Sequence, residues 1–182
     1  MTKKLHLAKH VLSIILCVAI MLGYMPITAL AEETVTGGTC GAETNDGGVE
    51  SVTWSYDAAT TTLTISGTGA VADYAAGSSR PWIDYIEEIT TVVINEGITR
   101  IGDRAFLNMT ALTGIFIPET VTELGFAAIA DCTTLESVSI PGSIKTITEY
   151  SISNCTKLKE IRLSEGVEVL EEYAFYGNGI EN

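Results

Sequence analysis

A repeat of 23 residues runs through the second half of this 182-residue sequence. Apolar residues recur at the same five positions of four consecutive copies, 89–111, 112–134, 135–157 and 158–182, with no insertion. The five columns are Ile89/Leu112/Leu135/Leu158, Ile94/Ile117/Ile140/Leu163, Ile98/Val121/Ile144/Val167, Ile101/Leu124/Ile147/Leu170 and Phe106/Ile129/Ile152/Phe175. A fixed period of this length predicts a solenoid, in which each repeat is one coil stacked on the preceding coil.

The second copy shows what one coil is expected to contain. Ile115 and Ile117 alternate with other residues, which predicts a short strand with its buried side turned to the interior. Pro118 ends this strand, and Val121 returns to the interior. The small residues of 125–130 are compatible with a short helical turn. One strand and one helical turn per coil predict an α/β repeat of the leucine-rich type.

Residues 32–88 precede the repeats and form a separate, β-rich region in this interpretation. Two alternating runs, 52–56 and 63–66, flank an Asp-led turn and predict a β-hairpin. Gly67, Gly69 and the stretch 75–79 predict a flexible link. Pro81-Trp82 is expected to anchor the leader to the first repeat, which begins at residue 89.

Residues 1–31 have the layout of a secretory signal peptide. Three lysines precede an apolar run, and the small-x-small pair Ala29 and Ala31 predicts cleavage after Ala31. We therefore expect export of residues 32–182.

Residues 32–182 keep 7 basic and all 23 acidic residues, so their net charge is 7 − 23 = −16. Such a charge argues against nucleic acid or anionic lipid as ligand.

Both histidines, His6 and His10, lie in the signal segment. Their loss removes Ser-His-Asp and Cys-His catalysis and every His-containing zinc site, and we expect no metal or cofactor. Pairs of acidic residues can hydrolyse glycosides, but these are expected on a solvated face. The pairs are Glu87/Glu88 and Glu171/Glu172.

Cys132 and Cys155 occupy the same repeat position in adjacent copies. A disulfide between them is conceivable, whereas burial of two small side chains is the favoured interpretation.

Four phrases in the repeats carry a resemblance to a known family. They are 115–118 (Ile-Phe-Ile-Pro), 138–141 (Val-Ser-Ile-Pro), 101–106 (Ile-Gly-Asp-Arg-Ala-Phe) and 131–135 (Asp-Cys-Thr-Thr-Leu). They resemble the BspA-like leucine-rich repeat family of bacterial surface and secreted proteins. In the leader, Trp54, 63–69 and 81–82 resemble the cap that often precedes these repeats. Departures from the family pattern are Ser164 for proline, Met109 and Asn178 in the cysteine column, and Ile129 and Ile152 for Phe.

The resemblance implies a right-handed solenoid with a parallel β-sheet on one face, preceded by a β-hairpin N-terminal cap. It also implies binding, usually in adhesion, and it supplies no catalytic residue. The expected function is thus a non-catalytic, secreted or cell-surface module that binds a protein or glycoprotein on host or neighbouring cells. The alternative is the N-terminal targeting module of a larger exported hydrolase. The last copy lacks a polar cap, so we also expect either further repeats or self-association at this end.

The expected ligand-binding face is the outward side of the repeat sheet. When the fourth and sixth positions of each copy are buried, the third and fifth face outward. These positions are Thr91, Gly114, Ser137 and Glu160 in one column, and Val93, Phe116, Ser139 and Arg162 in the next. Phe116 beside Val93 would form an exposed apolar patch, and an aromatic residue near Arg162 matches the composition of interface hot spots.

Overall fold

The computed structural model describes residues 35–43, 50–77 and 80–180. The expected signal peptide, with Ala29 and Ala31, lies outside these residues. The strands are β1 (Val35–Thr39), β2 (Ser51–Asp57), β3 (Thr62–Ala70), β4 (Thr91–Ile94), β5 (Ile98–Ile101), β6 (Gly114–Phe116), β7 (Glu123–Leu124), β8 (Ile129–Ala130), β9 (Ser137–Ile140), β10 (Thr146–Ile147), β11 (Ile152–Ser153), β12 (Glu160–Leu163) and β13 (Val169–Leu170). A 3-10 turn, η2 (Ile83–Tyr85), precedes the first repeat.

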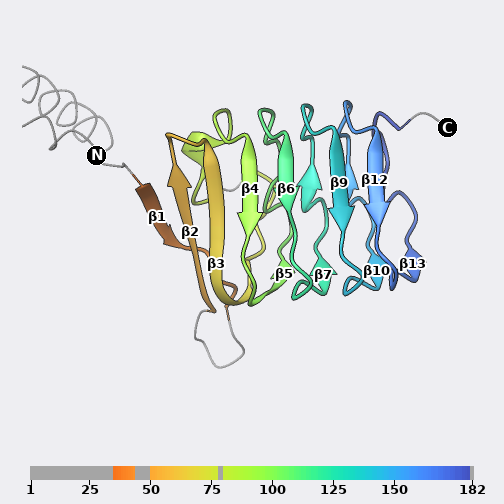
Figure 1. Ribbon diagram of the computed structural model, residues 1–182, viewed down its shortest axis with the longest axis horizontal. Helices are drawn as coiled ribbons and strands as arrows, with labels where there is room; N and C mark the ends of the chain where they lie inside the picture. The colour runs from red at the N-terminus through yellow and green to blue at the C-terminus, as the bar shows by residue number, and fades with distance from the viewer. Residues whose placement is uncertain (1–34, 44–49, 78–79, 181–182) are drawn as a thin grey trace, which may run out of the picture. The chain divides into compact units, whose positions relative to one another are not determined.

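Equivalent strands of neighbouring coils pair in parallel at an offset of one repeat. Val92 lies opposite Ile115 in the β4–β6 pair, and Arg100 lies opposite Glu123 in the β5–β7 pair. The same offset holds for β8–β11, β9–β12 and β10–β13. Figure 1 shows β4, β6, β9 and β12 side by side, with β5, β7, β10 and β13 in a second row. The predicted stack of coils is therefore confirmed.

The third side of each coil consists of turns, with the short strands β8 and β11 in the second and third coils. The α/β prediction is wrong there, because no α-helix lies in the described part of the chain. Two positions per coil adopt positive φ, whereas an α-helix requires φ near −63°. The first position is occupied in the four coils by Arg104, Ala127, Tyr150 and Tyr173. The second is occupied by Asn108, Asp131, Asn154 and Gly177. The small residues of 125–130 thus form a turn and strand β8 instead of a helix. Backbone bonds join these turns between coils, including Phe106 N–H to Ala128 O at 2.9 Å.

The apolar columns form the core, as predicted, in the first three coils, except that Ile117 is only partly buried. Ile89, Leu112 and Leu135 are fully buried, and so are the equivalents of Ile98 and Ile101 in these coils. The fourth coil departs from this pattern, since Leu163 and Leu170 are 42% and 53% exposed. Among the described residues no further coil packs against it.

The predicted hairpin is confirmed, and it continues the repeat sheet. Strands β2 and β3 are antiparallel with Trp54 opposite Ile65, and β1 pairs with β2. One end of β3 then pairs in parallel with β4, where Ile65 lies opposite Ile94. The other end of β3 pairs with β5 at Gly69 and Ile98. A single long strand therefore starts both rows of repeat strands.

Gly67 and Gly69 lie inside β3, so the predicted flexible link is wrong at these two residues. Their φ angles of 108° and 113° belong to a region that favours glycine, and they let β3 bend from one row to the other. A Cβ on Gly67 would also lie 1.9 Å from the Ser51 carbonyl oxygen. These glycines are needed for backbone geometry and for close approach of β2.

Trp82 anchors the leader to the first coil, as expected. Its side chain is fully buried, and its Nε1 donates a hydrogen bond to the Ala105 carbonyl at 3.2 Å. Its ring centroid lies 6.1 Å from that of Trp54 in the hairpin and 5.9 Å from that of Phe106 in the first coil. The indole therefore joins the hairpin and the repeats in one core.

We expect Gly67→Ala to lower the free energy of unfolding by at least about 2 kcal/mol, because the new Cβ meets backbone at an unfavourable φ. Gly114→Ala is the matched control, since a Cβ there has no heavy atom within 4 Å and its φ is not positive. Urea unfolding followed by circular dichroism measures both variants. Equal midpoints for the two would contradict the role of Gly67.

Candidate ligand-binding face

The eight residues expected to face outward all lie on β4, β6, β9 and β12. None of them is buried, while Val92, Ile115 and Val138 between them point into the core. Parallel ladders hold the equivalent positions in line within the β4–β6 pair and within the β9–β12 pair. Both predicted columns thus lie on the outward side of these four strands.

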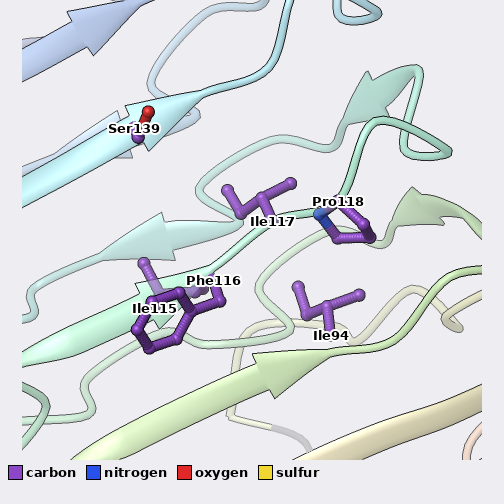
Figure 2. A pocket seen from close by; sticks show the side chains of 6 residues that line it. All are labelled: Ile94, Ile115, Phe116, Ile117, Pro118 and Ser139. Atoms are coloured by element: carbon purple, nitrogen blue, oxygen red, sulfur yellow. The ribbon is translucent and has the colours of Figure 1, made fainter.

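Phe116 dominates this face, because 65% of its surface is exposed. Beside it lies a hollow with a volume of about 330 Å³. The hollow is lined by Ile94, Ile115, Phe116, Ile117, Pro118 and Ser139 (Figure 2). Two of these, Phe116 and Ser139, were predicted as face residues. Sequence reasoning missed the other four, because it assigned the isoleucines to the buried columns and Pro118 only to the strand end.

The hollow lies where the ladder of outward strands is interrupted. Within the described strands, β6 pairs with β4 and β9 pairs with β12, but no ladder joins β6 to β9. In other coils the residue after the strand donates its N–H to the preceding coil, as Ser164 does to Ile140 O at 3.0 Å. Pro118 and Pro141 occupy that position in the middle coils and have no N–H to donate. At the equivalent offset Pro141 would face Ile117 O, so Pro141 was the signal in the sequence that could have located this junction. Pro118 belongs to the β4–β6 pair, which stays closed.

Hydroxyl side chains form hydrogen bonds to backbone carbonyls at other places between the second and third coils. The second row is also interrupted, between β7 and β10. Thr134 Oγ1 donates to Leu112 O at 2.8 Å, and Ser143 Oγ donates to Val121 O at 2.5 Å. Thr148 Oγ1 donates to Leu124 O at 2.8 Å. The bonds of Ser143 and Thr148 join the third coil to the second while the backbone ladders are open on two sides, and the bond of Thr134 closes the second coil on itself.

Arg162 lies apart from Phe116, at the end of the face. Its guanidinium forms a forked pair with Glu160, with both N–O distances at 2.8 Å. Strand β9 separates Arg162 from Phe116, which places them about 10 Å apart at the usual strand spacing. The structure therefore does not combine them into one hot spot. An exposed ion pair of this kind adds little stability.

The carboxylates considered for catalysis are all exposed, as predicted: Glu87, Glu88, Glu171 and Glu172. Glu88 accepts a hydrogen bond from the Tyr56 hydroxyl at 2.9 Å. No group of three or more His, Cys, Asp or Glu side chains is placed to hold a metal ion in the described ranges. Those ranges also contain no helix long and apolar enough to cross a membrane.

The cysteines of the described chain are buried free thiols. Cys132 and Cys155 are not joined by a disulfide, in agreement with the favoured interpretation of their column. The hydrogen bond with Cys155 and burial both raise the pKa of the Cys132 thiol. Burial raises the pKa of Cys40 to about 12. Cys40 and Cys132, held in this protonated state, are poor nucleophiles, whereas the hydrogen bond with Cys132 lowers the pKa of Cys155.

A family model of the BspA type leucine rich repeat region matches residues 84–182 in six copies. This match covers more than half of the chain. The chain belongs to the BspA-type leucine-rich repeat family. No match was found among curated proteins. The family assignment explains why the same 23-residue register governs both the core columns and the outward columns.

A solved leucine-rich repeat structure shares the fold. A leucine-rich repeat protein from Eubacterium ventriosum matches with a TM-score of 0.58 and 24% identity, over 75% of this chain and 40% of that one. One from Bacteroides ovatus matches with a TM-score of 0.46 and 24% identity, over 50% of this chain and 23% of that one. The BspA-type chain described here thus spans less than half the length of these relatives.

We expect the BspA-type chain to lose stability as the pH rises from about 9 toward 12. Burial raises the pKa of Cys40 from 9.0 to about 12 and that of Tyr56 from 10.0 to about 12. The unfolded chain therefore binds fewer protons than the folded chain in this window, so the free energy of unfolding falls with increasing pH. The stabilising contribution of these two groups is fully present below pH 9, and it is lost as the pH rises through their folded-state pKa of about 12.

Urea midpoints measured from pH 8 to pH 11 test this expectation. Cys40→Ala removes one of the two groups, and its midpoint should fall less steeply over the same range. A slope identical to that of the unmodified chain would show that Cys40 does not contribute.

Proposed function

We propose that this protein is an exported, non-catalytic binding module that acts in adhesion or recognition at a bacterial surface. Its ligand is a protein or glycoprotein on host or neighbouring cells. In this proposal the coils form a right-handed solenoid, the hairpin caps its N-terminal end, and residues 1–31 direct export. The outward columns from Thr91 to Arg162 form the ligand surface.

The exposed Phe116 beside the apolar hollow is the observation that supports this proposal best. Interface hot spots are aromatic anchors or pockets near the centre of a contact surface. Phe116 lies on β6, an inner strand of the outward row, and is 65% exposed. The hollow of about 330 Å³ is at the lower end of the range for ligand sites and suits one apolar side chain of a partner.

The charge of the chain supports a protein ligand over nucleic acid. Residues 32–182 carry 7 basic and 23 acidic residues. On the face itself, the Glu160 carboxylate pairs with the Arg162 guanidinium, so this end of the surface is locally neutral. The centre of the face is apolar, with Phe116 beside the hollow and the small hydroxyl of Ser139 at its edge. Apolar contact at the centre and polar groups around it match the anatomy of protein interfaces.

We expect Phe116→Ser to weaken ligand capture at least tenfold, equivalent to about 1.4 kcal/mol, because it removes the exposed anchor. The measurement is biolayer interferometry of residues 32–182 against immobilised mucin, extracellular-matrix proteins and intact bacterial cells. Arg162→Ala should change capture by less than threefold, since the guanidinium is already paired with Glu160.

Val169→Ser is the matched control, because this exposed apolar side chain lies on β13, outside the outward face. Circular dichroism verifies that each variant is folded. Undiminished capture by folded Phe116→Ser would overturn the choice of face. Failure of the unmodified chain to bind any of the three surfaces would argue against adhesion itself.

A further inference from the structure

A second exposed surface lies on the turns that follow β7, β10 and β13. It consists of four aromatic residues, Phe126, Tyr150, Tyr173 and Tyr176, which we call the aromatic stripe. The Phe126 and Tyr150 ring centroids are 5.7 Å apart, and those of Tyr150 and Tyr173 are 5.4 Å apart. Tyr176 meets both tyrosines edge-on, at 5.9 Å and 5.8 Å. The rings thus form one continuous surface across three coils.

The repeat register builds this stripe. Tyr150 and Tyr173 occupy equivalent positions of adjacent coils, and both have positive φ, at 56° and 62°. Because their backbones are alike, their rings lie nearly parallel, at an interplanar angle of 8°. The stripe lies on the turn side of the coils, so it is separate from the face that carries Phe116.

The stripe is exposed and acidic. Phe126, Tyr173 and Tyr176 are 39%, 45% and 56% exposed. Glu149, Glu171 and Glu172 flank the tyrosines in sequence and are themselves exposed. The Glu171 carboxylate accepts a hydrogen bond from the backbone N–H of Glu149 at 3.0 Å, so the Glu171 side chain lies against the equivalent turn of the preceding coil. A hydrogen bond with Glu172 raises the pKa of Tyr173.

The chain itself supplies a guanidinium at one end of the stripe. Arg104 occupies the position equivalent to Tyr150 and Tyr173 in the first coil, and its Cζ lies 4.8 Å from the centroid of the Phe126 ring. Arg104 Nη1 also donates to the Tyr74 carbonyl at 3.3 Å. This contact shows that the geometry of the stripe accepts an arginine over a ring, which is a favourable cation–π arrangement.

We propose that the aromatic stripe is a binding site for a cationic segment of a protein partner. Arginine or lysine side chains of that segment lie over the tyrosine rings, as Arg104 lies over Phe126, and pair with the carboxylates of Glu149 and Glu172. Exposed aromatic rings also suit sugars, but the flanking carboxylates favour a cation over a neutral glycan. The excess of 16 negative charges on residues 32–182 steers such a partner toward the protein.

The probe is a synthetic peptide that alternates Arg and Gly, compared with an equal-length peptide in which citrulline replaces Arg. Citrulline keeps the planar shape and removes the charge. We expect the Arg peptide to bind at least about tenfold more tightly than the citrulline peptide, because cation–π and ionic contacts both require the charge. Tyr150→Ser/Tyr173→Ser should weaken binding of the Arg peptide about tenfold, and Tyr173→Ser/Tyr176→Ser serves if the first variant is not folded.

Charge variants separate the stripe from general attraction between opposite charges. Glu149→Gln/Glu172→Gln should weaken Arg-peptide binding more than Glu96→Gln/Glu165→Gln, which changes net charge equally at exposed positions outside the stripe. Titrations by isothermal calorimetry at 50 mM and 150 mM salt compare the two. Equal losses in both double variants, or full binding by a folded tyrosine variant, would overturn the proposal. Binding of neutral oligosaccharides that is lost in the tyrosine variants would overturn it in favour of a glycan site.

Discussion

The register between neighbouring coils is the constraint on which the rest of this structure depends. Each coil pairs with the next at an offset of one repeat, so that Ile129 lies opposite Ile152 and Val138 opposite Ile161. A slip of one residue would move the buried side chains of a strand to the outward face. Burial of the leucine and isoleucine columns prevents this slip. It also places every outward residue on a predictable side, including Phe116.

Surface features arise where individual coils depart from the repeat. Pro141 removes the N–H donor that follows β9, the ladder between β6 and β9 is open, and the apolar hollow lies beside that opening. The turn positions differ from coil to coil, with Arg104 in the first coil and tyrosines in the last two. The repeat therefore provides a rigid frame, while single substitutions at equivalent positions provide two chemically different surfaces: an apolar face, and an acidic, aromatic stripe.

Much of the fold could be predicted from the sequence because its determinants are local or periodic. The hairpin strands follow from alternation around the turn at Asp57, and burial of Trp82 follows from its place just before the first coil. Two predictions were wrong for one physical reason. Residues such as Ala127 and Tyr150 adopt positive φ although their side chains do not favour it, and Gly67 has positive φ inside a strand. Such backbone angles depend on tertiary packing, which for Gly67 is the close approach of β2.

The sequence by itself determined the period, the buried columns and the set of residues on the outward face, because a strict repeat with alternating burial leaves one consistent arrangement. Only the tertiary structure decided that Ile94, Ile117 and Pro118 line a hollow and that Phe126, Tyr150 and Tyr173 stack as a stripe. Apart from the neighbours Ile117 and Pro118, these residues are separated by a coil or more of chain. Their contact depends on the angles of the turns and on which backbone ladders remain closed, which no local pattern encodes.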